Sequence, residues 1–179
     1  GIKLTPLQIL SFYNGIANDG EIVKPRFIYK IKNSGSSFIK EYEKEILNPS
    51  ICSYKTLLKV QKMMFNVVDK TWGTANKIKS SKLKMAGKTG TCQIDYTSDE
   101  TQYVSSFVGY FPYEKPEYSC IVVVNRPDKK IGYYGGEVAA PVFKEIAEKL
   151  FSRTPRDVIV KSYNYQYSSK KNYKQLKKI

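Results

Sequence analysis

The sequence contains no histidine, which excludes catalytic triads built on histidine and metal sites that use histidine ligands. Its three cysteines, Cys52, Cys92 and Cys120, are far apart and have no C-x-x-C spacing, so we expect small hydrophobic side chains rather than a zinc site. The longest purely apolar run, Cys120–Val124, is far shorter than the ~18 residues that cross a membrane. The sequence therefore indicates no metal site built on histidine or cysteine.

The length of 179 residues suits one domain, and 41% hydrophobic and 26% charged residues are ordinary globular usage. No signal peptide is visible, and because the chain begins at Gly1 rather than at methionine, we expect a fragment of a longer protein. The formal net charge is +14, and half of it lies in residues 152–179, where eight basic residues accompany one acid. We therefore divide the chain into a folded part, residues 1–151, and a basic tail, residues 152–179, predicted to be mostly flexible.

The tail interleaves tyrosines with lysines, which raises a rival hypothesis for its role. Such a segment can bind single-stranded nucleic acid by stacking and phosphate contacts. It can also dock on an anionic membrane, at about 1 kcal/mol for each basic residue near the lipid. A solvated end is the commonest state of a tail with this composition, so no nucleic-acid binding is expected.

Three segments show helical periodicity. A Thr-Pro start and an Asn-Asp-Gly end predict a helix from about Pro6 to Asn18. A second helix is predicted from about Ser53 to Asp69, with Met63 and Met64 filling the core. The apolar face of Glu137–Phe151 predicts a third helix.

Between these helices the sequence is typical of strands. Glu21–Leu47 is expected to form extended pieces and a turn, because a proline and an Asn-Ser-Gly segment interrupt it. Strands are predicted at Met85–Ile94, Tyr103–Phe111 and Tyr118–Asn125, with a polar loop at Asp95–Gln102. The order predicts an α+β fold in which a meander of three antiparallel strands packs against helices.

The segment Lys88-Thr89-Gly90-Thr91 carries the most chemistry. Lys88 supplies a cation that can hold an anionic group or stabilise charge near a nucleophile. Gly90 has no side chain, so a peptide can lie against the strand edge and bind through main-chain hydrogen bonds. Thr89 and Thr91 lie on one face of a strand, where two hydroxyls can bind a carboxylate. The Thr91 N–H can serve as an oxyanion donor, which stabilises a transition state by roughly 3–4 kcal/mol.

This motif alone does not decide the function. Lys-[Ser/Thr]-Gly-[Ser/Thr] is expected by chance in roughly one chain in a hundred of this length, given ordinary residue usage. The plain alternative is a solvated edge strand. Residues elsewhere leave similar alternatives open: Cys92 is expected to face the core or a cleft, and Trp72 to pack in the core or on the surface. The segment Tyr134–Gly136 either borders a site through a tight turn or serves only the backbone geometry before a helix.

The surroundings of the motif strengthen the functional interpretation. Met85–Thr91 resembles the third active-site motif of penicillin-binding proteins and serine β-lactamases. Further segments, in the same order, resemble class B penicillin-binding proteins, the monofunctional transpeptidases, and among them the division-type septal subgroup. These segments are Leu4–Gln8, Tyr13–Gly20, Gly73–Ala75, Ser106–Pro112 and Tyr134–Gly136 with Ala139–Phe143. The resemblance runs from Gly1 to about Phe151 and implies the C-terminal part of a transpeptidase domain.

The resemblance also implies residue roles. Lys88 would contact the serine of the family's second motif and organise proton transfer. Thr89 and Thr91 would bind the carboxylate of the substrate or of a β-lactam, with Gly90 between them against the peptide. The Thr91 N–H would form half of the oxyanion hole. These roles make Lys88 and Thr91 the predicted catalytic residues.

For the parent protein, the resemblance implies D-alanyl-D-alanine transpeptidation through a serine acyl-enzyme, without cofactors. Its partners would be peptidoglycan stem peptides, β-lactams and proteins of cell division or cell-wall synthesis. It would work at the extracytoplasmic (periplasmic) face of the cell membrane, tethered by an N-terminal anchor outside this sequence.

The sequence departs from the family in one respect, because no convincing Ser-x-x-Lys nucleophile motif is found. Ser37-Phe38-Ile39-Lys40 fits the letters but lies in an extended stretch, so we take it as a coincidence. A Ser-x-Asn second motif is also missing upstream of the third motif. Both are expected before Leu4, so this polypeptide alone is predicted to be inactive. The alternative is a non-catalytic module that binds cell-wall peptides or partner proteins.

Overall fold

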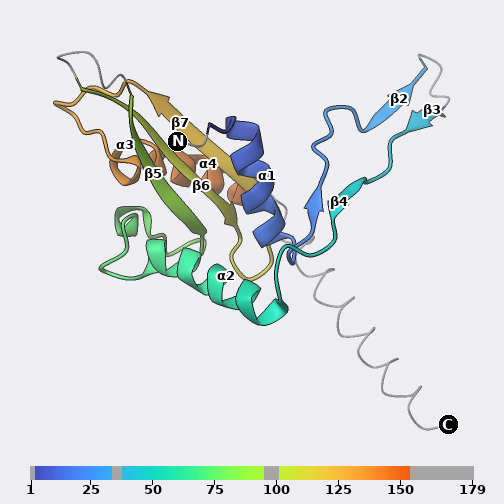
Figure 1. Cartoon of the computed structure of the whole chain (residues 1–179), viewed down its shortest axis with the longest axis horizontal. Coiled ribbons are helices and arrows are strands. Elements are labelled where there is room, and N and C mark those ends of the chain that lie inside the picture. Colours follow the sequence, from blue (N-terminus) through green and yellow to red (C-terminus); the bar gives the residue numbers. More distant parts are fainter. Residues whose placement is uncertain (1–2, 34–37, 95–100, 154–179) are drawn as a thin grey trace, which may run out of the picture.

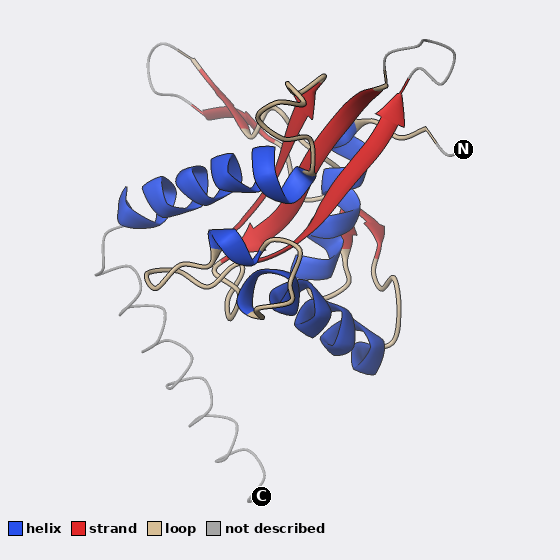
Figure 2. Cartoon of the chain, turned by 90° about the vertical axis from the view of Figure 1, so that its left-hand side faces the viewer, coloured by secondary structure: helices blue, strands red, loops and turns tan. Residues whose placement is uncertain are grey.

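The computed structural model describes residues 3–33, 38–94 and 101–153. A three-stranded antiparallel sheet carries helices on both faces, and a long arm of short strands extends away from it (Figures 1 and 2). The predicted α+β class is confirmed, with neighbours among solved structures described below. The predicted tail, apart from its first two residues, lies outside the described residues, as do the loop residues 95–100.

The sheet consists of β5 (Ala86–Ile94), β6 (Gln102–Phe111) and β7 (Tyr118–Asn125), in the order β5-β6-β7. The pairing of β5 with β6 runs without a shift from Ala86 opposite Tyr110 to the far end of β5. All three strands were predicted to within a residue at each end. Within the described chain, β5 has a neighbour on one side only, so its other edge is open.

Two helices cover one face of this sheet. Helix α1 (Pro6–Ala17) begins with a capping box, in which the hydroxyl of Thr5 accepts from the Gln8 N–H and the Gln8 side chain accepts from the Thr5 N–H. Helix α2 (Tyr54–Asp69) is capped by Ser53, whose hydroxyl accepts from the Thr56 N–H in the first turn. Both helices match their predicted ranges to within a residue at each end.

The third predicted helix is interrupted. A short helix α3 (Gly135–Val138) is followed by α4 (Ala140–Arg153), and Ala139 separates them. The cause is Pro141, which lacks an N–H and whose ring conflicts with the carbonyl four residues earlier, so it fits only the first turn of a new helix. The single helix over Glu137–Phe151 was therefore a wrong prediction.

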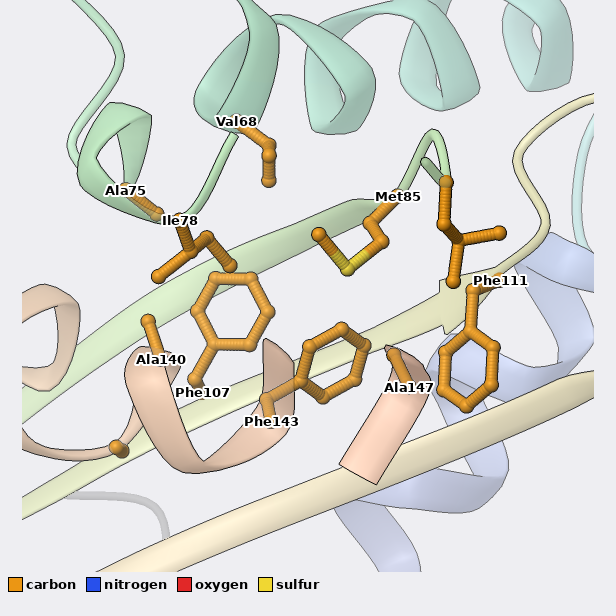
Figure 3. Close-up of a cluster of buried hydrophobic side chains, with 11 residues drawn as sticks. Val68, Ala75, Ile78, Met85, Phe107, Phe111, Ala140, Phe143 and Ala147 are labelled. Atoms are coloured by element: carbon orange, nitrogen blue, oxygen red, sulfur yellow. The ribbon is translucent and has the colours of Figure 1, made fainter. Parts of the chain in front are cut away.

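The two faces of the sheet bury separate cores, because alternate side chains of a strand point to opposite faces. On the α3–α4 face, Phe107 and Phe143 are both fully buried, with ring centroids 4.8 Å apart (Figure 3). On the α1–α2 face, Ala86 and Tyr110 pack with Ile16 and residues of α2. Helix α2 also reaches the first core through Val68 at its C-terminal end.

The arm comprises residues 22–33 and 38–48. In it, β1 (Ile22–Val23) pairs with β4 (Ile46–Asn48), and β2 (Lys30–Lys32) pairs with β3 (Phe38–Glu41). Both pairings contain a register shift. The extended pieces predicted for Glu21–Leu47 are thus confirmed as two short ladders.

Some predictions about single residues were wrong. Met64 is buried as expected, but Met63 is 65% exposed. All three cysteines are free; Cys92 is exposed, and Cys52 and Cys120 are partly buried against the two cores. In the described ranges, no helix has the length and apolar character to span a membrane, and no cluster of His, Cys, Asp and Glu could hold a metal ion.

Candidate active site

The motif Lys88–Thr91 lies in the first half of the edge strand β5, where its side chains divide between two faces. Thr89 pairs with Phe107 in the register and Thr91 with Ser105, so both threonines lie on the α3–α4 face, as predicted. Lys88 pairs with Val108 and lies on the α1–α2 face. The lysine and the two threonines thus start from opposite faces of the strand along one open edge.

The two threonines line a polar pocket of about 530 Å³, here called the hydroxyl pocket. It lies between β5, the segment that follows α2, and the start of α3. Its lining residues are Thr71, Gly73, Thr74, Asn76, Lys77, Thr89, Thr91, Tyr134, Gly135, Gly136 and Glu137. Four threonines and one lysine line the pocket together with a single carboxylate, that of Glu137, and their hydroxyls and ammonium suit the binding of an anionic group.

Hydrogen bonds hold both motif threonines in place. The hydroxyls of Thr89 and Thr74 lie 3.0 Å apart, and the Gly135 N–H donates to the Thr91 hydroxyl over 3.1 Å. The Lys88 ammonium donates to the Thr89 carbonyl oxygen over 2.9 Å and to the Thr89 hydroxyl over 3.3 Å. Sequence reasoning named the motif residues and placed Thr74 in a segment that resembles the family, but it did not foresee the contact of Thr74 with Thr89 or the role of the Gly135 N–H.

Gly135 can donate to Thr91 because it comes very close to the sheet. A Cβ atom at this position would lie 2.2 Å from the carbonyl oxygen of Ser106 and 2.5 Å from that of Gly90. No other residue type fits there without moving the start of α3. The segment Tyr134–Gly136 lines the hydroxyl pocket, and its Gly135 also serves the backbone geometry at the start of α3.

The glycine at position 90 also has a structural explanation, in addition to the predicted approach of a peptide. A Cβ atom there would lie 2.5 Å from the hydroxyl oxygen of Ser106 on the neighbouring strand. The absence of a side chain at Gly90 therefore leaves room for the Ser106 hydroxyl in its present position.

Tyrosine rings stand at the rim of the hydroxyl pocket. Tyr133 stacks on Tyr103 with ring centroids 4.4 Å apart, and Tyr134 lies 4.4 Å from Tyr133 on its other side. The Tyr133 hydroxyl donates to that of Tyr134 over 3.1 Å, and this hydrogen bond raises the pKa of Tyr133 above its ordinary value. The Ser105 hydroxyl donates to the Tyr133 carbonyl oxygen, which ties this rim to β6.

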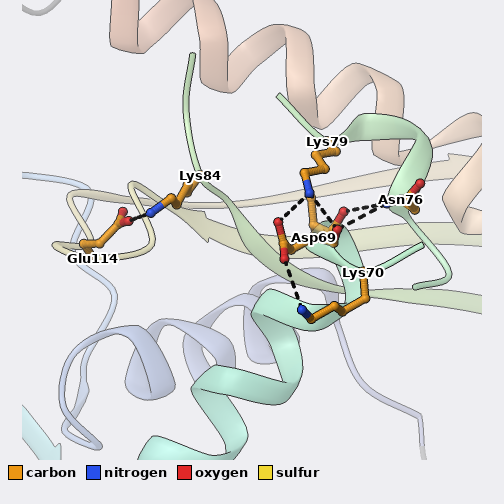
Figure 4. A network of polar contacts seen from close by, with 7 residues as sticks. Asp69, Lys70, Asn76, Lys79, Lys84 and Glu114 are labelled. Atoms are coloured by element: carbon orange, nitrogen blue, oxygen red, sulfur yellow. Dashed lines mark hydrogen bonds and ion pairs between the residues drawn. The ribbon is translucent and has the colours of Figure 1, made fainter. Parts of the chain in front are cut away.

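Polar contacts anchor the segment 70–84, which joins α2 to β5 and carries Thr74 (Figure 4). Asp69 accepts from Lys79 over 2.8 Å, and mainly this hydrogen bond lowers the pKa of Asp69. The Asn76 amide donates to the carbonyl oxygens of Val68 and Asp69, over 3.4 Å each. Near the start of β5, Lys84 forms an ion pair with Glu114 at 2.5 Å.

On the other face of β5, Lys88 borders an apolar groove of about 470 Å³ between α1 and α2. Phe12, Met63 and Trp72 line this groove and are 50%, 65% and 71% exposed. The structure therefore places Trp72 on the surface. Contiguous apolar side chains that remain exposed commonly mark a surface that another part of a protein covers.

The described residues supply no helix that opens with Ser-x-x-Lys. Phe38–Lys40 belongs to β3 in the arm, which agrees with a coincidental match at that position. Ser81-Lys82-Leu83-Lys84 also fits the letters and was missed, but it lies in a segment without helix before β5. A further match, at residues 168–171, lies outside the described residues.

An edge strand bearing a lysine and two threonines beside a hydroxyl pocket is an arrangement suited to acyl transfer, and comparison with known proteins identifies the family. The model of the family described as "Penicillin binding protein transpeptidase domain" matches residues 1–148. The chain therefore belongs to this transpeptidase family, and its relatives place it among the class B proteins.

Two relatives show how much of such a protein the chain represents. It is 32% identical over 152 residues to the peptidoglycan D,D-transpeptidase FtsI of Buchnera aphidicola subsp. Baizongia pistaciae, covering 84% of this chain and 25% of that protein. It is 28% identical over 163 residues to the penicillin-binding protein PbpB of Mycolicibacterium smegmatis, covering 86% and 25%. The chain thus spans a quarter of the length of these relatives.

Solved structures agree with the fold. The apo form of penicillin-binding protein 3 from Mycobacterium tuberculosis matches with a TM-score of 0.72 and 29% identity, over 86% of this chain and 36% of that one. The penicillin G acyl-enzyme complex of penicillin-binding protein A from M. tuberculosis matches with a TM-score of 0.69 and 22% identity, over 83% and 32%. The second likeness concerns the fold alone.

Proposed function

We propose that this chain is the C-terminal part of a peptidoglycan D,D-transpeptidase that cross-links stem peptides and is acylated by β-lactams. One observation carries this proposal: Thr89 and Thr91 present their hydroxyls to a polar pocket at the open edge of β5, directly beside Lys88. A substrate that adds to this edge as an extended strand brings its terminal carboxylate to the two hydroxyls.

The proposed reaction follows the acyl-enzyme route. A serine oxygen attacks the carbonyl carbon of the D-alanyl-D-alanine bond, an ester forms, and the terminal D-alanine leaves as an amine that takes up the serine proton. An amine of a second stem peptide then attacks the ester, forms the cross-link and returns the proton to the serine. Lys88 assists these proton transfers, and the Thr91 N–H stabilises the negative charge that develops on the carbonyl oxygen.

The serine belongs, in this proposal, to sequence outside these 179 residues. The apolar groove beside Lys88 supports this view, because its exposed Phe12, Met63 and Trp72 offer a surface for the remainder of the transpeptidase domain. Packing there would bring a nucleophile toward Lys88. The isolated chain is accordingly expected to remain unlabelled by a fluorescent penicillin.

The finer assignments follow the relatives. FtsI is the name of a relative that shares 32% of its aligned residues with this chain, and we infer the same septal role in cell division. We place the parent protein at the extracytoplasmic face of the membrane, with an N-terminal anchor and with partners among division or cell-wall synthesis proteins. A fluorescent fusion of the full-length protein that distributes evenly along the cell would argue against the septal role.

The decisive test labels the full-length protein with fluorescent penicillin beside its Lys88→Ala variant. Loss of the ammonium is expected to slow acylation about a hundredfold or more, since a group that assists proton transfer contributes on this scale. Lys82→Ala is the control, because Lys82 is exposed and lies before the catalytic strand. A folded wild type that takes no label would favour the alternative, a module that binds cell-wall peptides without catalysis.

A further inference from the structure

The hydroxyl oxygen of Thr89 has two polar neighbours, Lys88 and Thr74. The Lys88 ammonium lies 3.3 Å away and the hydroxyl of Thr74 lies 3.0 Å away. An ammonium can only donate, so Lys88 fills one of the two acceptor positions of the Thr89 oxygen. The direction of the bond between Thr74 and Thr89 then decides where the single proton of Thr89 points.

Two arrangements of that bond exist. If Thr89 donates to Thr74, its proton is used and the hydroxyl has none left to offer a ligand. If Thr74 donates to Thr89, both acceptor positions of Thr89 are filled and its proton is free. A carboxylate is an acceptor only, so a carboxylate bound at Thr89 requires the second arrangement.

The Thr91 hydroxyl allows an independent comparison. It accepts a hydrogen bond from the Gly135 N–H over 3.1 Å, and a backbone N–H can only donate. The Thr91 proton is therefore free for a ligand in the pocket. If Thr74 donates to Thr89, the protons of both threonine hydroxyls are free to bind the same ligand.

The backbone on both sides of Thr74 is fixed, which keeps its hydroxyl within reach of Thr89. The Gly73 N–H donates to Lys70 over 2.8 Å and the Ala75 N–H donates to Val67 over 3.0 Å. Ala75 is also buried in the core. The Thr74 hydroxyl itself belongs to an exposed residue that lines the pocket, so its replacement need not disturb the core.

We propose that Thr74 is a positioning residue, whose hydroxyl donates to Thr89 and so directs the Thr89 proton toward the carboxylate of the substrate. This inference rests on the proposed function, since it assumes that a carboxylate binds at Thr89. It adds a residue outside the Lys-Thr-Gly-Thr strand to the determinants of carboxylate binding.

The test compares Thr74→Val and Thr74→Ser with the wild type in the full-length protein. The acylation kinetics are measured with benzylpenicillin and with its methyl ester. For benzylpenicillin, Thr74→Val is expected to weaken the initial non-covalent binding about three- to tenfold, the scale of one hydrogen bond, with the maximal acylation rate within about twofold. Thr74→Ser keeps the donor and is expected to bind within about twofold of the wild type. For the ester, which lacks the carboxylate charge, the deficit of Thr74→Val is expected to fall below about twofold.

Thr56→Val is the matched control, because Thr56 is exposed on α2, outside the hydroxyl pocket, and its hydroxyl also lies near another hydroxyl, that of Ser53, at 2.9 Å. It is expected to behave as the wild type. The inference is overturned if Thr74→Val binds benzylpenicillin as well as or better than the wild type. It is overturned as well if Thr74→Ser is as weak as Thr74→Val, or if acid and ester suffer equally, which would indicate a purely structural role. A folded wild type that neither compound acylates would overturn the proposed function, and the inference with it.

Discussion

The sheet and the arm are both antiparallel β-structure, yet they are stabilised in different ways. In the sheet, strands of 8 to 10 residues bury side chains on both faces and keep one register. In the arm, the strands have 2 to 4 residues; the side chains of β2 and β4 are exposed, those of β1 are only partly buried, and Phe27 beside them is 87% exposed. Ion pairs such as Lys24 with Glu45, at 2.9 Å, join the two sides of the arm instead.

This difference explains where the site lies. A slip of one residue in β5 would turn Thr89 and Thr91 to the opposite face, and two buried cores oppose that slip. In the arm no core opposes it, and each ladder already contains a shift. A constellation that needs fixed geometry can therefore be held by the sheet but not by the arm.

Replacing a phenylalanine by alanine in each region should give the largest difference between them in the free energy of unfolding. Phe143→Ala removes a fully buried ring and is expected to lower the free energy of unfolding by about 3–5 kcal/mol. Phe27→Ala removes an exposed ring in the arm and is expected to change it by less than about 0.5 kcal/mol. Urea unfolding of the two variants measures both values, and comparable losses would show that the arm packs against something in solution.

The sequence predicted the sheet and two helices well because their patterns are local. The caps at Thr5 and Ser53 and the apolar runs of the strands lie within the elements that they define. The break before α4 follows from Pro141, and that signal was present but outweighed by the apolar period of Glu137–Phe151.

The site was only half predictable for a physical reason. The motif Lys88–Thr91 is contiguous, so its residues could be named, and alternation along a strand gave their faces. The Thr74 hydroxyl is 15 residues away from Thr89 and the Gly135 N–H is 44 residues away from Thr91. Such contacts depend on how loops return to the sheet, and a single sequence carries no local pattern for them.

Two exposed ion pairs, one in each region, allow a second comparison with smaller expected effects on stability. Lys24 pairs with Glu45 in the arm, and its N–H also donates to the Glu45 carbonyl oxygen over 2.9 Å; Lys84 pairs with Glu114 beside the sheet. Both pairs are exposed, so Lys24→Ala and Lys84→Ala should each cost at most about 1 kcal/mol of global stability.

Their local effects should nevertheless differ. In Lys24→Ala, amides of β1 and β4 should exchange hydrogen faster, because little else joins these strands, whereas Lys84→Ala should leave exchange in β5 unchanged. Hydrogen exchange followed by mass spectrometry measures both. Faster exchange in β5 than in β1 would contradict the contrast between the regions.

The smallest expected effect concerns acid pH. The hydrogen bond from Lys79 lowers the pKa of Asp69 beside the sheet, and that from Lys44 lowers the pKa of Glu21 at the base of the arm. A carboxylate with a lowered pKa in the folded state stabilises above its unfolded pKa, and this contribution disappears as the pH falls through the folded value.

Stability should therefore decline slightly below about pH 4, where an unperturbed aspartate begins to be protonated. Asp69→Asn should remove part of that decline. The difference in free energy of unfolding between variant and wild type should therefore shrink as the pH falls from about 6 to about 2.5. Glu21→Gln should change the global transition less, because Glu21 serves a region that contributes little to it. Unfolding curves across this pH range measure these differences. A larger effect of Glu21→Gln would mean that the base of the arm, and not the segment 70–84, is coupled to the core.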